Sequence, residues 1–226
     1  MDKVVFFDID DTLLDTSNFA KIAREAAINA MVDNGLDLTN EEAYNLLKEI
    51  IAQKGSNYDK HFNVLTKTVY GEENYKLIAS GMITYHNVKF ALLRPFPRTN
   101  EVLIHLKTKG YKLAVISNGI TIKQWEKLVR MNLHPFFDKI ITSEEVGFEK
   151  PNKRIFEEAL NAMNCSSENS IMIGNKFKED AMGGVNAGMS SILVNSKVTD
   201  EERKKIIDEN INIQIIDNID EVDSIL

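Results

Sequence analysis

Two carboxylates follow the first apolar segment of the chain. The run Val-Val-Phe-Phe ends at Asp8, and Asp10 comes two residues later. Because side chains alternate along a strand, Asp8 and Asp10 are expected to point the same way. One carboxylate could then act as a nucleophile or a metal ligand while the other transfers a proton. A solvated turn closed by Asp and Thr hydrogen bonds is the competing interpretation, and the two acids alone do not decide between them.

Further polar residues follow later apolar segments. Ser117 and Asn118 precede a helix start, where backbone N–H groups favour an anion. Lys150 lies in a loop, and Asn175 ends another apolar segment five residues before Asp180. Each of these has an ordinary structural explanation as a turn, a helix lead-in or a first-turn acid. Their ordered placement at the ends of successive strands favours a shared functional site.

The elements that position these residues alternate between strand and helix. Branched and aromatic residues before Asp8 predict a strand buried on both faces. Further strands are expected at 113–116, 139–142, 171–173, 191–194 and, at the edge of the sheet, 213–216. This alternation predicts an α/β fold, a Rossmann-like parallel sheet with helices on both faces. Such sheets bind ligands beyond the carboxyl ends of their strands, which is where the polar residues fall.

A helical segment interrupts this pattern after the first strand. Residues 16–92 show helical periodicity without a convincing strand, which predicts an inserted α-helical bundle. The expected domains are therefore an α/β core, 1–15 and 93–226, and the insertion. Thr39 and Glu42 are spaced as a capping box within the insertion, and Thr99 is placed to cap the first helix after it.

Composition excludes several classes of protein. The 226 residues carry a net charge of -7 without a basic cluster, which argues against nucleic acid and anionic membranes as partners. The single cysteine, Cys165, is expected in a surface turn and excludes an intrachain disulfide and a thiolate metal site. No apolar run is long enough for a membrane span, and Asp8 interrupts the N-terminal one, so we expect no signal peptide. These features predict a protein of the reducing cytoplasm.

The ordered motifs resemble the haloacid dehalogenase-like superfamily, and the resemblance covers almost the whole chain. The motifs are Asp8-Ile9-Asp10-Asp11-Thr12, Ser117-Asn118, Lys150-Pro151, and Gly174 with Asp180, followed by Asn186-Ala187-Gly188-Met189. The inserted bundle resembles the α-helical cap of one subfamily. Most members of that subfamily are magnesium-dependent phosphatases of small phosphorylated metabolites, so the resemblance implies such a substrate and Mg²⁺ as cofactor.

The resemblance also implies a role for each motif residue. Asp8 would take the phosphoryl group as an aspartyl-phosphate, and Asp10 would be the general acid and base. The Asp8 side chain and the Asp10 backbone carbonyl would bind Mg²⁺. Ser117 would hold a phosphate oxygen beside the Asn118 amide, and Lys150 would neutralise the nucleophile and the transferring group. These roles suit phosphoryl transfer, which needs positioning and cations around negative charge. Asp10 argues against carbon–halogen hydrolysis, because the dehalogenase members lack this second acid.

One position departs from the family pattern. Asn175 stands where the phosphatases usually have an Asp that ligates Mg²⁺. An amide oxygen can still coordinate the ion, but the site loses one negative charge, so we expect weaker binding. Asp180 remains as a metal-site residue, acting through a metal-bound water or by pairing with Lys150. Two alternatives stay open: a catalytically impaired regulatory protein that binds a phosphorylated ligand, and a phosphomutase.

The insertion is expected to choose the substrate. Asn57, Tyr58 and His61 lie in a polar stretch between two of its predicted helices and are candidates for substrate contact. A solvated loop is an equally good explanation of the same residues. The exposed helices of the insertion could support a homodimer, although no pattern requires one.

Overall fold

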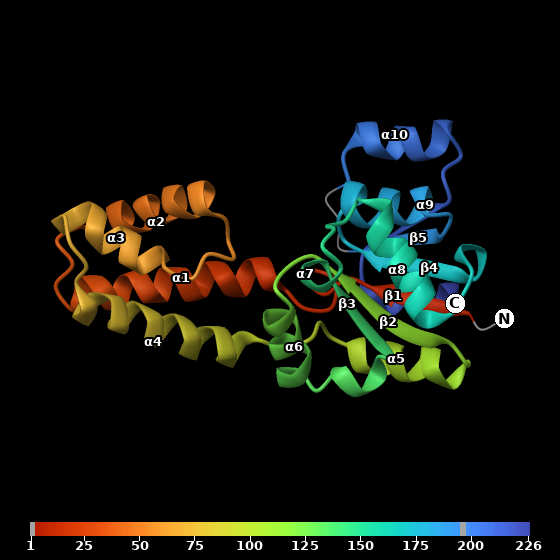
Figure 1. Ribbon diagram of the computed structural model, residues 1–226, viewed down its shortest axis with the longest axis horizontal. Helices are drawn as coiled ribbons and strands as arrows, with labels where there is room; N and C mark the ends of the chain where they lie inside the picture. Colours follow the sequence, from red (N-terminus) through yellow and green to blue (C-terminus); the bar gives the residue numbers. More distant parts are fainter. Residues whose placement is uncertain (1–2, 195–197) are drawn as a thin grey trace. The chain divides into compact units, whose positions relative to one another are not determined.

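The computed structural model describes residues 3–194 and 198–226, which form two compact units (Figure 1). The core unit comprises Met1–Asp15 and Arg94–Leu226, and the helical unit comprises Thr16–Leu93. The role of the helical unit as a cap over an active site stays a prediction.

The core unit is built on a six-stranded parallel sheet with the order β3-β2-β1-β4-β5-β6. The strands are β1 (Val4–Phe7), β2 (Lys112–Ser117), β3 (Lys139–Thr142), β4 (Ser170–Gly174), β5 (Ser190–Val194) and β6 (Ile213–Ile216). All four residues of the central strand β1 are buried. The predicted α/β fold with a parallel sheet and an edge strand at 213–216 is confirmed.

Helices cover both faces of this sheet. They are α5 (Thr99–Thr108), α6 (Thr121–Arg130), α7 (Ser143–Val146), α8 (Lys153–Met163), α9 (Gly183–Asn186), α10 (Asp200–Asp208) and α11 (Val222–Ile225), with a π-helix at Phe177–Met182 and short 3-10 turns at His134–Phe136, Ser167–Asn169 and Ile219–Glu221. Phe156 of α8 packs in one apolar cluster with Val4 and Phe6 of β1. Figure 1 shows α5 on the opposite side of the sheet from α8.

Two local predictions in the core unit are wrong. Thr99 does not cap α5, because Arg98 takes the cap position in a left-handed conformation and Thr99 is already the first helical residue. The buried Thr99 hydroxyl has no hydrogen-bond partner within the described part of the chain. Cys165 does not lie in an exposed turn but is half-buried, because it packs against the apolar cluster under α8.

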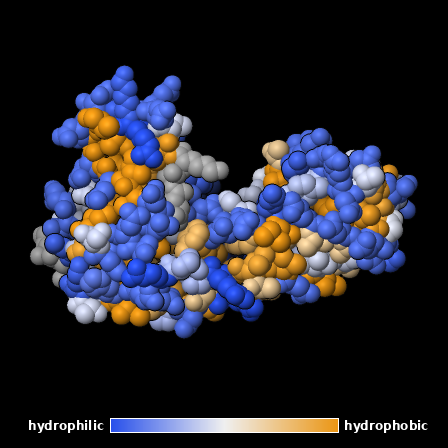
Figure 2. All heavy atoms as spheres, turned by 180° about the vertical axis from the view of Figure 1, so that it is seen from behind, coloured by the Kyte–Doolittle hydropathy of each residue, from blue (hydrophilic) through white to orange (hydrophobic). Residues whose placement is uncertain are grey.

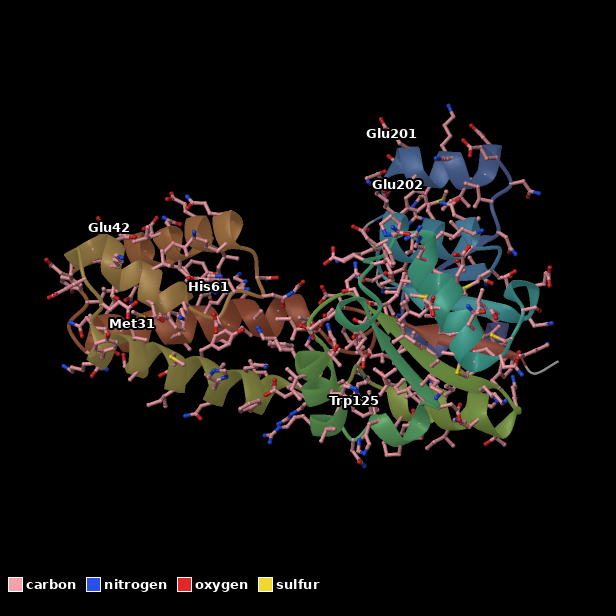
Figure 3. All side chains as sticks on the ribbon, in the orientation of Figure 1. Met31, Glu42, His61, Trp125, Glu201 and Glu202 are labelled. Atoms are coloured by element: carbon pink, nitrogen blue, oxygen red, sulfur yellow. The ribbon has the colours of Figure 1, made fainter. Side chains whose placement is uncertain are left out.

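The helical unit contains four helices around its own apolar cluster. They are α1 (Thr16–Asp33), α2 (Asn40–Lys54), α3 (His61–Tyr70) and α4 (Tyr75–Leu92). The Met31 side chain of α1, labelled in Figure 3, packs against α4 at Gly81, where an added Cβ would lie 2.7 Å from Sδ of Met31. The predicted capping box of Thr39 and Glu42 is confirmed at the start of α2.

The visible surface is mostly hydrophilic, and its apolar residues gather in a few patches (Figure 2). Within residues 3–194 and 198–226, no helix combines the length and the apolar character needed to cross a bilayer.

Candidate active site

The central strand delivers Asp8 to the carboxyl end of the sheet. Its backbone N–H donates to the Ile173 carbonyl of β4 (2.8 Å), which extends the parallel pairing by one residue. The Leu13 N–H then donates back to the Ile9 carbonyl (2.9 Å), so the chain turns directly after the acid. The Thr12 hydroxyl donates to Oδ2 of Asp8 (3.4 Å). A buried carboxylate is thus held at the place where open α/β sheets bind ligands.

Lys150 is the cation that contacts Asp8. Its ammonium nitrogen lies 2.7 Å from Oδ1 of Asp8, 2.6 Å from Oδ1 of Asp180 and 2.7 Å from the carbonyl oxygen of Ile116. These three oxygens match the three N–H groups of an ammonium ion. Burial opposes the charged form, but the carboxylates of Asp180 and Asp8 raise the pKa of Lys150 above its ordinary value. The side chain is therefore a buried, protonated lysine.

Asn118 fixes the loop that carries Lys150. Its side-chain Oδ1 accepts from the Lys150 backbone N–H (2.7 Å), and its Nδ2 donates to the Lys150 carbonyl (3.1 Å). The Asn118 side chain is thus committed to the backbone of Lys150, and the predicted place of the Asn118 amide beside a phosphate stays a prediction. Ser117 differs, because its buried hydroxyl has no hydrogen-bond partner among the residues described. A buried polar group without a partner requires an explanation, and a bound anion would provide one.

Burial dominates the electrostatics of Asp8. It raises the pKa of this carboxyl to about 6, against the attraction of Lys150. The negative charges of Asp180 and Asp10 contribute to this rise in the same direction as burial. The cluster combines these three acids with the ammonium of Lys150, and added positive charge would stabilise the ionised form of Asp8.

Asp180 is held in place by a backbone N–H group and by the ammonium of Lys150. It is 1% exposed, and its Oδ2 accepts from the Lys176 N–H (2.9 Å) while Oδ1 faces Lys150. Gly174 permits this arrangement, because a Cβ at that position would lie 2.4 Å from Cβ of Asp180. Of the two roles considered for Asp180, the structure shows the ion pair with Lys150, and a contact through a metal-bound water stays a prediction.

Asn175 presents an acceptor that could bind a cation. Its Oδ1 is buried and accepts no hydrogen bond from the described residues. Within the same residues, no three His, Cys, Asp or Glu side chains form a metal-binding group. The oxygens expected to hold a cation at this strand end are one carboxylate (Asp8), one amide (Asn175) and the backbone carbonyl of Asp10. Such oxygens suit a hard cation that keeps several waters.

Asp10 contacts two residues that the sequence analysis missed. The ammonium of Lys127 lies 2.5 Å from Oδ1 of Asp10, and Nε2 of Gln124 donates to Oδ2 (3.3 Å). Both residues come from α6, the helix that follows Ser117. The only sequence signal was a polar pair at i and i+3, which is common on solvent-facing helices.

Of the candidate substrate residues, Asn57 and Tyr58 lie between α2 and α3, whereas His61, predicted in the same polar stretch, is the first residue of α3. The ring Nε2 of His61 is 2.9 Å from the Gly55 carbonyl oxygen, and the rings of Tyr58 and His61 meet edge to face at 5.4 Å (Figure 3). Asn57 lies in the same loop. These contacts give His61 a structural role at the start of α3, and substrate contact by the three residues stays a prediction.

Comparison with known families identifies the chain over most of its length. The sequence profile of haloacid dehalogenase-like hydrolases matches residues 5–194. A protein of Methanothermobacter thermautotrophicus named glyceraldehyde 3-phosphate phosphatase is 66% identical over 224 residues, which cover 99% of each chain. A protein of the same name from Methanocaldococcus jannaschii is 46% identical and covers 94% of this chain and 93% of its own.

The solved structures agree with the fold. The HAD-hydrolase YfnB of Bacillus subtilis, described as bound to magnesium, aligns with a TM-score of 0.69 and 22% identity. The alignment covers 100% of this chain and 99% of the YfnB chain. At this level of identity the likeness concerns the fold.

Proposed function

The chain belongs to the haloacid dehalogenase-like hydrolases, and we propose that it is a magnesium-dependent phosphatase that releases phosphate from glyceraldehyde 3-phosphate. The observation that carries this proposal is the 66% identity, over 99% of both chains, to a phosphatase named for that substrate. The intact set of Asp8, Asp10, Ser117 and Lys150 supports it, because these residue types provide a nucleophile, a proton donor and groups for the phosphate.

Asp8 is the nucleophile in this mechanism. One of its carboxylate oxygens attacks phosphorus, the ester P–O bond breaks, and the leaving oxygen takes its electron pair together with a proton from Asp10. The Asp10 carboxylate then accepts a proton from water as the water oxygen attacks the phosphorus of the aspartyl-phosphate. Phosphate departs and the carboxylate of Asp8 is restored. The position of Asp8 in a dry strand end, against one ammonium ion, suits such an attack.

Lys150 and Ser117 bind the transferring group in this proposal. Lys150 already neutralises Asp8 at 2.7 Å, and its charge would offset the negative charge that spreads over the phosphoryl oxygens. The Ser117 hydroxyl, which has no hydrogen-bond partner among the described residues, supports a hydrogen bond to one of those oxygens. The Asn118 side chain contributes by fixing the Lys150 loop. Any contact of Asn118 with the phosphate would then be made by its backbone N–H.

The oxygens at this strand end fit Mg²⁺. The ion would be held by the carboxylate of Asp8, the backbone carbonyl of Asp10 and Oδ1 of Asn175. Asp180 would contribute indirectly, because it pairs with Lys150. The bound ion would supply the positive charge that keeps Asp8 ionised and stabilises the phosphoryl group. Because Asn175 replaces a carboxylate, we expect weaker Mg²⁺ binding than an Asp would give.

The test is phosphate release from a panel of small phosphate monoesters that includes glyceraldehyde 3-phosphate. Mg²⁺ is titrated from none to high millimolar for the wild type and for Asp8→Asn. The proposal expects Mg²⁺-dependent release, with the highest kcat/KM for the triose phosphate, that disappears in Asp8→Asn. Absence of release at every Mg²⁺ concentration would favour the binding-only alternative, and transfer of phosphate to a second sugar would favour the phosphomutase.

A further inference from the structure

Helix α6 has an unusual distribution of side chains. Its buried residues include Gln124 and Lys127, whereas Trp125 is 38% exposed and Val129 is 54% exposed. Figure 3 labels Trp125 on this helix. A surface helix normally buries its apolar side chains and exposes its charges. Burial of an unpaired lysine lowers the stability of a fold, so the partners of Lys127 must account for its burial.

Those contacts converge on Asp10. The ammonium of Lys127 meets Oδ1 of the carboxylate at 2.5 Å, and the amide of Gln124 meets Oδ2 at 3.3 Å. Each oxygen of the carboxyl group is therefore contacted by a different side chain of α6. The Lys127 side chain is 11% exposed and that of Asp10 is 29% exposed, so the pair lies at the edge of the buried site.

The two side chains of α6 are themselves anchored. Nε2 of Gln124 also donates to the Asn118 carbonyl at the end of β2 (2.9 Å), and Lys127 donates to Oε1 of Gln124 (3.0 Å). The start of α6 is tied to α7 through the Thr121 N–H, which donates to Oε2 of Glu144 (2.8 Å). A network anchored at several points can hold one conformer of a carboxyl group.

We propose that Gln124 and Lys127 are positioning residues that hold the Asp10 carboxyl group for proton transfer to the leaving oxygen. The proposal rests on the phosphatase function above. General acid catalysis needs the donor within about 3 Å of the accepting atom. The two α6 contacts favour one rotamer of the Asp10 side chain, and their removal should weaken that preference. Proton transfer leaves Asp10 as a carboxylate, which Lys127 then faces with its positive charge.

The leaving group provides a specific test. Departure of 4-nitrophenolate needs no proton, whereas the alkoxide of a triose must be protonated as it leaves. Because kcat/KM reports the steps up to the first irreversible one, it isolates the step in which Asp10 acts as an acid. We expect Lys127→Met to lower kcat/KM for glyceraldehyde 3-phosphate about 100-fold and for 4-nitrophenyl phosphate less than about 5-fold.

Matched variants separate positioning from general damage. Gln124→Leu should show the same substrate-dependent loss to a smaller extent, and Lys127→Arg should recover part of the activity. Arg130→Met removes one positive charge from the exposed end of the same helix and should leave both kcat/KM values unchanged. In an Asp10→Asn background, Lys127→Met should lower kcat/KM for the triose phosphate by less than about twofold further, because the group that it positions is gone.

The outcomes are distinguishable. Equal losses of kcat/KM for both substrates, or fully multiplicative losses with Asp10→Asn, would overturn the positioning role while the wild type remains an active phosphatase. A wild type that releases phosphate from neither substrate would instead refute the proposed function. If Lys127→Met fails to fold, as shown by circular dichroism, Gln124→Leu decides the question by the same ratio of kcat/KM values.

Discussion

Replacement of Lys150 should destabilise the protein more than replacement of any exposed charged residue. The Lys150→Met variant keeps the length of the side chain but removes the ammonium ion, which lies within 2.7 Å of three oxygens, while Asp8 and Asp180 stay buried. Removal of one partner from a buried ion pair costs about 3–5 kcal/mol. We expect a loss of that size near pH 8, because both carboxylates are then left without their cation.

The loss should depend on pH in a defined direction. In the wild type the folded-state pKa of Asp8, about 6, already exceeds the ordinary value of 3.8, so ionisation of Asp8 reduces stability as the pH rises through this range. Without Lys150 that pKa should rise further. Protonation then relieves part of the repulsion at pH 5, and the destabilisation by Lys150→Met should be smaller at pH 5 than at pH 8.

Urea unfolding followed by circular dichroism, in EDTA at both pH values, measures this effect. Lys107→Met is the matched control, because Lys107 pairs with Asp138 at 2.7 Å but the two side chains are 34% and 42% exposed. Its cost should stay below about 1 kcal/mol at both pH values. Equal costs for the two variants, or no change in the cost of Lys150→Met with pH, would refute the reasoning.

Three further predictions concern the same strand end. Asn175→Asp should tighten Mg²⁺ binding by about tenfold in calorimetry without substrate, because it adds a negative charge to a hard-cation site; an unchanged Kd would contradict the role given to Asn175. Gly174→Ala should cost about 1–3 kcal/mol in urea unfolding, because the new Cβ would lie 2.4 Å from Asp180; an unchanged midpoint would show that Asp180 moves freely. In EDTA, the free energy of unfolding of the wild type, relative to that of Asp8→Asn, should fall by about 3 kcal/mol between pH 4 and pH 7. This is the free-energy equivalent of raising the pKa of Asp8 from 3.8 to about 6. A difference that stays constant with pH would contradict the buried, ionisable state of Asp8.

The sheet was predictable because its strands carry a strong local signal. Residues 4–7 are all apolar and all buried, and the strand at 139–142 has the predicted bounds. Parallel central strands lack alternation but are short and flanked by polar turns, so their ends can be located. Once the strand ends were known, the topology of a parallel sheet brought Asp8, Ser117 and Asp180 to one edge.

The contacts of the side chains were not predictable in the same way. Lys127 and Asp10 are separated by 117 positions, and in the sequence Lys127 is an ordinary charge on an amphipathic helix. Likewise, the Asn118 side chain binds the Lys150 backbone 32 positions away, which no local pattern specifies. Burial of a charged or amide side chain depends on a partner supplied by the tertiary fold, so the sequence indicated the candidate site but not its supporting contacts.

The central claim is that Asp8 carries the phosphoryl group. The most direct measurement is a rapid acid quench of the wild type with glyceraldehyde 3-phosphate and Mg²⁺, followed by borohydride reduction and mass spectrometry of the peptide that contains Asp8. Reduction of an aspartyl-phosphate yields homoserine, so the account predicts homoserine at position 8 in the wild type and none in Asp8→Asn. Steady release of phosphate with unmodified Asp8 at every quench time, or homoserine at another aspartate, would contradict it.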